Sequence, residues 1–338
     1  MKNPLTDNDL IVFDGACGTT LQLRDIPDAA WDGHEGCNEY LNLSSPDVIR
    51  AMHRAFVAAG AEVLETNTFG ATRFVLSEYG LQDRVTEINA AAVAHARAAL
   101  EGADCGAVAG SVGPGTKLAA LGHIGVAELT AAYREQMQAL VQAGVDCLII
   151  ETCQDPLQIK TAVVTALAVC REAGREVPIL VSVTVEQTGT LLAGSDIAAV
   201  AVMLEPFPIF SLGLNCATGP AEMESHIRYL AQKWPCRISC IPNQGLPEVV
   251  DGRTRYPMSP RDFAAHMLSF VKDYGVSIVG GCCGTTPEHI RALAVALRDV
   301  RPAAHGLHLA DAGPQGEGAP TGRPTARCSS CCSLSVSV

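Results

Sequence analysis

The stretch "QAGVDCLIIET", residues 142–152, contains the pattern that decides the fold. A helix-forming segment stops at Ala-Gly, an apolar β-branched run follows at once, and the run ends in Glu-Thr. The same order occurs earlier in "AAGAEVLET", residues 58–66, so the two stretches form a weak internal repeat. Each predicts a helix that ends at a glycine and then a buried strand, which is the arrangement of a βα unit.

Eight short β-branched runs of this kind occur along the chain, and the longer Ala-rich amphipathic segments between them predict helices. Ser45 and Gly60 are the predicted start and end of one such helix, and Gly144 ends another. Eight βα units in roughly 300 residues predict a (β/α)8 TIM barrel, although periodicity alone does not exclude a doubly wound open sheet. The runs are residues 11–15, 61–68, 105–114, 145–152, 178–185, 208–216, 237–243 and 276–283.

Length, charge and composition narrow the classes of protein. The chain has 338 residues, enough for one large barrel or two ordinary domains, and its net charge of −12 argues against a nucleic-acid partner. No run reaches the roughly 18 apolar residues of a membrane span. The first ten residues have neither the basic end nor the apolar centre of a signal peptide. We therefore expect a cytoplasmic protein with no membrane partner, whose 14 cysteines are thiols or metal ligands.

The predicted barrel covers residues 1–302, and a change of composition separates it from the remainder. Residues 303–338 are rich in Gly, Pro and Ser and lose all periodicity, which is typical of a linker or tail. The "CSSCC" of this tail, residues 328–332, is a weak candidate for a second metal site because no further partner motif accompanies it.

Active sites of (β/α)8 barrels lie at the carboxyl ends of the strands, and the unusual residues of this chain fall there. They are acids, amides and cysteines that follow directly on apolar runs. These residues are Asp14 after the first run, Glu65, Thr66 and Asn67 after the second, Glu151 and Thr152 after the fourth, Cys216 after the sixth, Asn243 after the seventh, and Cys282 and Cys283 after the eighth.

The adjacent cysteines of "GGCCGTTPEHI", residues 280–290, predict a metal site. A disulfide between neighbours is strained, and two thiolates are too few for zinc, so Cys216 is the candidate for the third ligand. Three soft thiolates favour one tetrahedral Zn²⁺ per chain, and the lack of a regular four-cysteine spacing argues against a zinc ribbon or an iron–sulfur cluster. The fourth position is left open, and a thiol bound there would be deprotonated.

Seven motifs occur together along the chain. They are "FDGACGTTLQ" (13–22), "LNLSSPDVIRAMHRAFVAAGAEVLETNTFGAT" (41–72), "AGSVGPGTK" (109–117), "IIETCQD" (149–155), "GLNCATGP" (213–220), "PNQGLP" (242–247) and "GGCCGTTPEHI". In type and order these motifs resemble the homocysteine-binding barrel of the cobalamin-dependent methionine synthase family. The resemblance covers about residues 10–300.

The resemblance implies a reaction and a set of ligands. Zinc would be held by Cys216, Cys282 and Cys283, and the sulfur of homocysteine would be the incoming ligand. Methylcobalamin, carried by a separate corrinoid-binding domain or protein, would be the external methyl donor. Asn243 is the candidate for an exchangeable fourth ligand, and a simple turn residue before Gly245 is the alternative.

The amino-acid end of homocysteine needs partners of its own. Glu151, helped by Asp14, is assigned to the ammonium group, and Glu65 is a third acid nearby in the predicted barrel. Backbone amides around Gly15 and Ala16, or those after Glu65, are assigned to the carboxylate. The amides after Glu65 belong to Thr66 and Asn67. The alternative is that one of the three acids only caps a loop.

Other functions remain open at this level. Betaine- and S-methylmethionine-dependent homocysteine methyltransferases share the three-cysteine zinc barrel, although the second and sixth runs look more like methionine synthase. A non-enzymatic zinc or thiol sensor would not need the strand-end acids. A phosphosugar enzyme would need a phosphate loop or a Schiff-base lysine, but in "GSVGPGTK" Thr116 precedes Lys117, which is the wrong order for a P-loop. The chain is a single module or, as its abrupt ending favours, a piece of a longer enzyme.

The remaining cysteines have less specific predictions. Cys17 and Cys153 lie near the predicted site loops and are expected to line them. The others beside apolar runs are expected to be small core residues. These are Cys105, Cys147, Cys170, Cys236 and Cys240.

Overall fold

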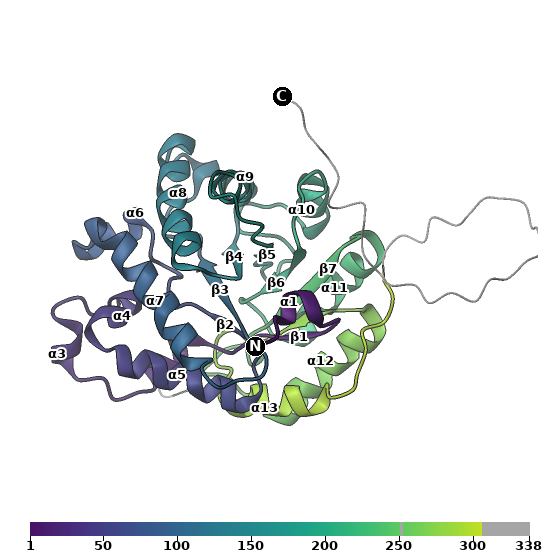
Figure 1. The fold of residues 1–338 in the computed structure, drawn as a ribbon. Helices are drawn as coiled ribbons and strands as arrows, with labels where there is room; N and C mark the ends of the chain where they lie inside the picture. The colour runs from purple at the N-terminus through teal and green to yellow at the C-terminus, as the bar shows by residue number, and fades with distance from the viewer. Residues whose placement is uncertain (251–252, 306–338) are drawn as a thin grey trace, which may run out of the picture.

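The computed structural model describes residues 1–250 and 253–305 and confirms the predicted (β/α)8 barrel (Figure 1). Within these residues eight parallel strands follow one another in the order β1-β10-β7-β6-β5-β4-β3-β2. A single bridge between Phe13 and Val63 joins the two edge strands, so the sheet nearly closes and the open-sheet alternative is excluded. The strands are β1 (Ile11–Val12), β2 (Val63–Glu65), β3 (Ala107–Val112), β4 (Cys147–Cys153), β5 (Ile179–Val183), β6 (Ser211–Asn215), β7 (Arg237–Ile241) and β10 (Ile278–Val279).

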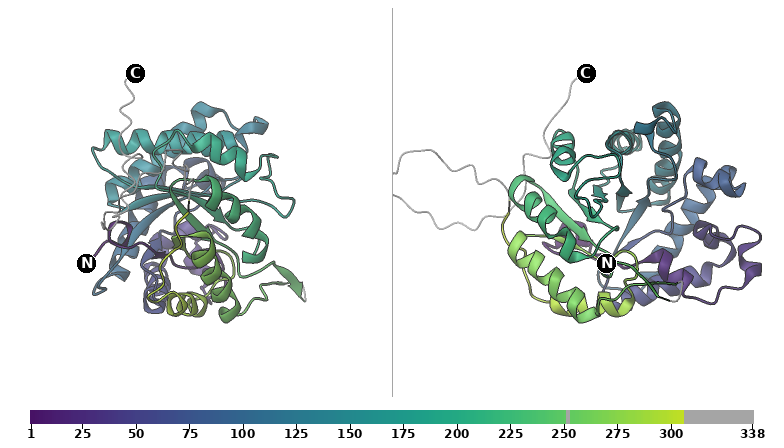
Figure 2. Two further views of the ribbon diagram at one scale, coloured as in Figure 1. Left: turned by 90° about the vertical axis from the view of Figure 1, so that its right-hand side faces the viewer. Right: turned by 180° about the vertical axis from the view of Figure 1, so that it is seen from behind.

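The longer helices surround the strands, as the views in Figures 1 and 2 show. Two end as predicted, since Gly60 and Gly144 take left-handed conformations, with φ of 105° and 96°, and close their helices with backbone hydrogen bonds. Ser45 is the predicted N-cap position, but its side chain makes no capping bond there. The helices are α5 (Pro46–Ala59), α7 (Val85–Ala99), α8 (Val126–Ala143), α9 (Pro156–Glu172), α10 (Ile197–Leu204), α11 (Pro220–Lys233), α12 (Pro260–Tyr274) and α13 (Pro287–Ala296).

Short helices occur at both ends of the barrel. At the amino-terminal end, Leu5 of α1 (Pro4–Asp7) packs against the residues inside the barrel, so the helix covers this opening (Figure 1). The other short helices follow strands. They are α2 (Cys17–Gln22), α3 (Asp28–Trp31), α4 (Leu41–Ser44), α6 (Arg73–Leu76) and the 3₁₀ turns Asn38–Tyr40, Ser77–Tyr79, Gln82–Arg84 and Ala119–Leu121.

Apolar side chains fill the inside of the barrel below the strand ends. This inner cluster is separate from the larger core between the sheet and the helices. Because the interior is packed, a ligand can reach the predicted site residues only from the carboxyl end of the barrel. The inner cluster consists of Leu5, Ile11, Phe13, Val63, Ala107, Ala109, Cys147, Ile149, Leu180, Ile241 and Ile278.

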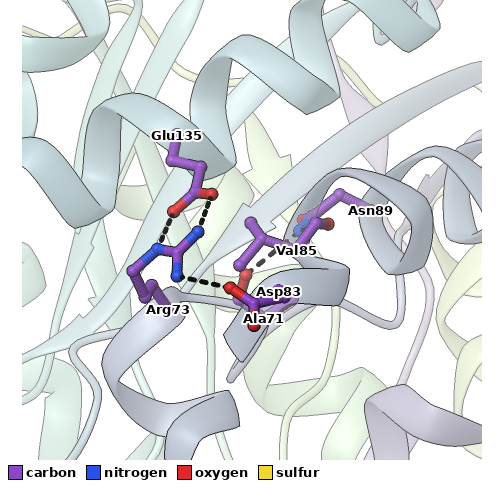
Figure 3. Close-up of polar contacts among 6 residues, drawn as sticks. All are labelled: Ala71, Arg73, Asp83, Val85, Asn89 and Glu135. Atoms are coloured by element: carbon purple, nitrogen blue, oxygen red, sulfur yellow. Dashed lines mark hydrogen bonds and ion pairs between the residues drawn. The ribbon is translucent and has the colours of Figure 1, made fainter. Parts of the chain in front are cut away.

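The long connection from β2 to α7 is held down on its neighbouring helices (Figure 3). Arg73 donates to both carboxylate oxygens of Glu135 at 2.8 Å and to Asp83 at 3.1 Å. These ion pairs are largely open to solvent, which screens them, so they contribute little to stability. The buried amide of Asn89 donates to the carbonyl oxygens of Ala71 and Val85. The connection that follows the predicted site residues is therefore anchored to α8 through Arg73 and to α7 through Asn89.

A feature that the sequence pattern did not predict is an antiparallel hairpin between β7 and α12. Strands β8 (Glu248–Val250) and β9 (Arg253–Arg255) form it, and it extends away from the barrel (Figure 2, left). Tyr256 follows the hairpin, where the chain returns to the barrel. Its ring packs directly on Gly284, because a Cβ atom at Gly284 would lie only 2.5 Å from the ring. The hairpin thus places an aromatic residue beside the eighth strand's cysteines.

The prediction of core cysteines is confirmed for three of the five. Cys147, Cys170 and Cys240 are buried, whereas Cys105 and Cys236 are half-buried. Cys153 was expected to line the site, but it is fully buried in the core between sheet and helices, because the β4–β5 register shifts before it.

The predicted boundary at residue 302 lies in a segment that still contacts the barrel. The Ala303 N–H donates to the carbonyl oxygen of Val271, and the His305 ring bonds to that of Cys236. The "CSSCC" segment lies outside the described residues. In the part of the chain that the structure describes, no helix is both long and apolar enough to cross a membrane.

Candidate metal and substrate site

Three cysteines predicted from two separate strand ends meet at the carboxyl end of the barrel. The Sγ atoms of Cys216, Cys282 and Cys283 all lie within 4.8 Å of one another. The Cys216–Cys283 distance is 3.9 Å and the Cys282–Cys283 distance is 4.0 Å. Tetrahedral zinc with Zn–S bonds of about 2.3 Å separates two sulfurs by about 3.8 Å. The two measured pairs are therefore within a few tenths of an ångström of the spacing that one zinc ion requires, and the third pair lies within 4.8 Å.

Glycines explain how two adjacent cysteines reach this position. A Cβ at Gly281 would lie 2.4 Å from the hydroxyl of Thr285, and Gly284 has a φ of 81°. The turn is closed by Thr285, whose N–H and hydroxyl both donate to the carbonyl oxygen of Cys282, at 3.0 and 2.6 Å. The glycines of "GGCCG" therefore stand where the backbone packs too closely on its neighbours for a side chain, and only the two cysteines between them have room for one.

Cys216 reaches the cluster through strained backbone. It directly follows β6 with a φ of 61°, and the next residue, Ala217, has a φ of 54°. Left-handed conformations of residues other than glycine each cost on the order of 1–3 kcal/mol and persist only where the surroundings hold them. The Thr218 N–H donates to the Cys216 carbonyl at 2.6 Å, which closes this turn.

The three thiols form hydrogen bonds with one another, and these bonds change their pKa values. Hydrogen bonds from Cys216 and Cys282 lower the pKa of the Cys283 thiol to about 3. The hydrogen bond with Cys216 is the largest of the effects that raise the pKa of Cys282. Tyr256 also hydrogen-bonds to Cys283. The cluster consequently favours a negative charge on Cys283, as a cation site requires.

Asn243 lies between the turn that contains Cys216 and the turn that contains Cys282 and Cys283. Its N–H donates to the carbonyl oxygen of Thr218, and the next residue, Gln244, donates its N–H to that of Cys283. The backbone forms the expected turn, since the Gly245 N–H donates to the Asn243 carbonyl. Yet the Asn243 Oδ1 atom is buried without a hydrogen-bond partner among the described residues. A buried amide oxygen left in this state indicates a missing cation or donor.

The three predicted acids come together beside the cysteines and have no cationic partner. Asp14 and Glu151 are 4% and 8% exposed, Glu65 is half-buried, and none of them forms an ion pair within the described residues. Burial is the main cause that raises the pKa of all three, and it raises that of Glu151 to about 7. Repulsion from Glu151 adds to the rise at the other two. An ammonium group bound among these acids would relieve the repulsion.

The turn after Asp14 has one amide engaged and one available. The Ala16 N–H donates to the hydroxyl of Thr285 at 3.1 Å and approaches its carbonyl oxygen at 3.3 Å. Of the predicted pair, only the Gly15 N–H makes no hydrogen bond to another described residue, and it is left as the carboxylate donor. A Cβ at Gly15 would lie 2.7 Å from the ring of Phe56, which explains the glycine.

Thr66 and Asn67 lie at the site, but their side chains bond to the protein. The Thr66 hydroxyl accepts from the Ser111 N–H at 3.0 Å. The Asn67 amide donates to the carbonyl oxygen of Asn38 at 2.7 Å, and its oxygen accepts from the thiol of Cys17 at 3.3 Å. Cys17 therefore lines the site as expected. These contacts make both side chains anchors of the loop. The Thr66 N–H is also engaged, because it donates to the carbonyl oxygen of Ala109 at 2.9 Å, so of the two predicted amides only that of Asn67 makes no hydrogen bond to another described residue.

Several residues around Glu151 were missed by sequence reasoning. The Ser111 hydroxyl donates to Glu151 Oε1 at 2.5 Å, and the amide of Asn215 lies 3.5 Å from Oε2. Each carries a local signal: Ser111 stands in the glycine-rich strand end, and Asn215 directly precedes Cys216. Tyr256 had no such signal, because the hairpin before it was not predicted.

Comparisons with known proteins agree with this geometry. A family model described as homocysteine S-methyltransferase matches residues 11–297. The methionine synthases of Mycobacterium tuberculosis (strain ATCC 25618 / H37Rv) and Mycobacterium leprae (strain TN) are each 42% identical, over 298 and 292 residues. These matches cover 86% and 85% of this chain but 25% and 24% of the relatives, so the chain spans about a quarter of their length.

A solved structure is also similar. The metallated form of the homocysteine methyltransferase MmuM from Escherichia coli superimposes with a TM-score of 0.67 at 25% sequence identity. The match covers 86% of this chain and 97% of that chain. The barrel described above is therefore similar to a whole protein of known fold.

Proposed function

Because the chain belongs to the homocysteine S-methyltransferase family, we propose that it transfers a methyl group to the thiol of homocysteine at a zinc ion held by three cysteines. The observation that carries the proposal is the pairing of two sites at one end of the barrel. Three sulfurs suited to zinc lie beside three buried acids that have no cationic partner within the described residues. A substrate with both a thiol and an ammonium group could bind zinc through its sulfur and the acids through its ammonium group.

The metal would be held by Cys216, Cys282 and Cys283, and Asn243 would fill the fourth position in the absence of substrate. When bound, zinc keeps the substrate sulfur deprotonated at neutral pH. A free thiol with a pKa of about 8.5 is only a few per cent ionised at pH 7, so this is worth about 2 kcal/mol in thiolate population.

The protein's own groups would orient the substrate. Glu151, with its carboxylate hydrogen-bonded to Ser111, would accept from the ammonium group, and Asp14 would add a second negative charge. Asp14 is itself fixed, because both of its carboxylate oxygens accept from the Glu65 N–H at 3.2–3.3 Å. The Gly15 N–H would donate to the carboxylate. Buried acids on one side and sulfurs on the other would thus fix the direction of the substrate's chain.

The methyl donor would approach from outside, and we propose methylcobalamin on a partner domain or protein. The 42% identity to methionine synthases supports this donor. The rim of the barrel supports an external docking partner, because large apolar side chains are exposed in the segments that follow five successive strands. These are Leu23, Phe69, Leu121, Leu157 and Leu192. We also propose a cytoplasmic location, where reducing conditions keep the cysteine ligands as thiols.

A comparison of donors tests the proposal. Zinc-loaded protein is incubated with homocysteine and methylcobalamin, betaine or S-methylmethionine, and methionine and cob(I)alamin are measured. We expect methionine and cob(I)alamin to form together with methylcobalamin only. Cys216→Ala should abolish turnover, whereas Cys105→Ala, which removes a half-buried thiol away from the site, should retain it.

Different failures of this experiment have different meanings. Turnover with betaine or S-methylmethionine alone would keep the zinc-thiolate chemistry but refute the corrinoid donor. Zinc binding without turnover by any of the three donors would favour a non-enzymatic zinc or thiol-binding module.

A further inference from the structure

The side chain of Asn215 is a buried connection between the two halves of the site. It is the last residue of β6 and is 1% exposed. Its Oδ1 atom accepts from the Thr152 N–H at 3.0 Å and from the Ser182 hydroxyl at 2.9 Å. Its Nδ2 atom donates to the Thr152 hydroxyl at 2.7 Å and lies 3.5 Å from Glu151 Oε2. The amide therefore clasps Thr152 through both backbone and side chain.

Thr152 needs such a clasp because its backbone is unfavourable. It has a φ of 60°, which is an outlier for a β-branched residue. The pairing of β4 with β5 shifts between Ile150 and Cys153, so the chain bulges at residues 151–152. Thr152 thus donates its N–H to the Asn215 side chain instead of to the neighbouring strand.

The bulge decides which residues of β4 face the inside of the barrel. Ile149 belongs to the inner cluster, while Ile150 and Cys153 belong to the core on the helix side. Strict alternation along a strand would turn residue 153 inward. The extra residue resets the alternation after Glu151, whose carboxylate remains inside, in contact with Ser111.

Asn215 also directly precedes the metal-ligand candidate Cys216, which has a φ of 61°. A second bond holds this junction, since the Thr184 hydroxyl donates to the Asn215 carbonyl oxygen at 2.9 Å. The same residue is therefore joined covalently to one half of the site and by hydrogen bonds to the other.

We propose that Asn215 is a positioning residue: by holding Thr152 in its left-handed conformation, it sets the Glu151 carboxylate for the substrate ammonium at a defined place relative to Cys216. This inference rests on the proposed function. It deepens that function by naming the group that relates the ammonium end of the site to the sulfur end.

A double-mutant cycle tests the inference. In zinc-loaded protein, Asn215→Ala should weaken homocysteine binding, measured by calorimetry, by about 10- to 100-fold, the range for losing a partner that orients a site residue. Thr152→Gly should have a smaller effect, because glycine adopts the left-handed conformation without strain. In the Thr152→Gly background, Asn215→Ala should cause a much smaller further loss. Equal fold-losses in both backgrounds would overturn the inference, as would unchanged affinity of Asn215→Ala.

Two further measurements separate positioning from general damage. Zinc content should stay at one per chain in Asn215→Ala, and Ser182→Ala, which removes one bond to the same Oδ1 atom, should change homocysteine affinity by less than about threefold. If Asn215→Ala does not fold, Asn215→Ser replaces it with the same expectations. Loss of zinc in parallel with loss of affinity would mean that the residue only supports the fold of the metal site, and would refute the positioning role.

Amide hydrogen exchange judges the inference independently of substrate. Exchange at residues 151–153 should rise in Asn215→Ala, and unchanged exchange there would refute the clasp. Failure of the wild-type protein to bind homocysteine would instead refute the proposed function, whatever the exchange shows.

Discussion

Replacing Glu151 by glutamine should have opposite effects on binding and on stability. Glutamine keeps the size of the side chain and can still accept from Ser111, which bonds to Oε1 at 2.5 Å, but it removes the charge. Losing a charged hydrogen-bond partner of the substrate ammonium costs about 1.5–3 kcal/mol, or roughly a 10- to 150-fold weaker affinity for homocysteine. Zinc content should not change, because the three sulfurs are untouched.

The stability effect follows from the pKa of Glu151, which burial raises from 4.5 to about 7. Between these values the folded state holds a proton that the unfolded state has released, so the folded state loses stability as the pH rises. Once the pH exceeds 7 the full difference is reached, about 1.4 kcal/mol per pKa unit, or about 3 kcal/mol in all. Glutamine carries no such penalty. Glu151→Gln should therefore be more stable than wild type by about 2–4 kcal/mol at pH 8, with little difference near pH 4.5.

Calorimetry of homocysteine binding and urea unfolding at pH 4.5, 6 and 8 provide the two measurements, with both proteins in the same metal state. Glu62→Gln is the control, because Glu62 is a half-buried acid that also has a raised pKa but bonds to Asn8 and Val12 at the other end of the barrel. It should leave homocysteine affinity unchanged. A Glu151→Gln protein that binds normally, or that is destabilised at pH 8, would show that this acid is structural and not a binding group.

Three other changes have defined outcomes. Alanine at Cys216, Cys282 or Cys283 should each abolish zinc binding, measured by atomic absorption, while circular dichroism shows the barrel retained; zinc at full stoichiometry in any of them would contradict the ligand set. Asn243→Ala should keep zinc and bind homocysteine more tightly in calorimetry, because a competing ligand is gone; unchanged affinity would leave Asn243 as a turn residue only. His53 is buried without hydrogen-bond partners in the described structure, and burial lowers its pKa to about 3, so relative to His53→Gln the wild type should lose about 1.4 kcal/mol of stability per pH unit below 6.5, measured as the difference between the two proteins in urea unfolding at pH 4–7.

The sequence by itself determined the architecture and predicted which end of the barrel the candidate site residues share. Helices that end at Gly60 and Gly144 and apolar runs that follow them are local patterns, and local backbone preferences specify a βα unit without reference to the rest of the chain. Because parallel strands place their carboxyl ends at one edge, the residues after each run, among them Glu151 and Cys216, could be assigned to one region before any distance was known.

Tertiary structure alone decided what these residues can do. The acids have raised pKa values because barrel closure removes water around them, and no local pattern encodes that desolvation. Likewise, which amides stay available depends on partners far along the chain: the Ala16 N–H is taken by Thr285, 269 residues away. The bulge at Thr152 exists because Asn215, 63 residues away, supplies a hydrogen-bond acceptor that the adjacent strand does not. Such contacts form only when the sheet closes, and for that reason distances, burial and the strained residues of the site had to come from the fold.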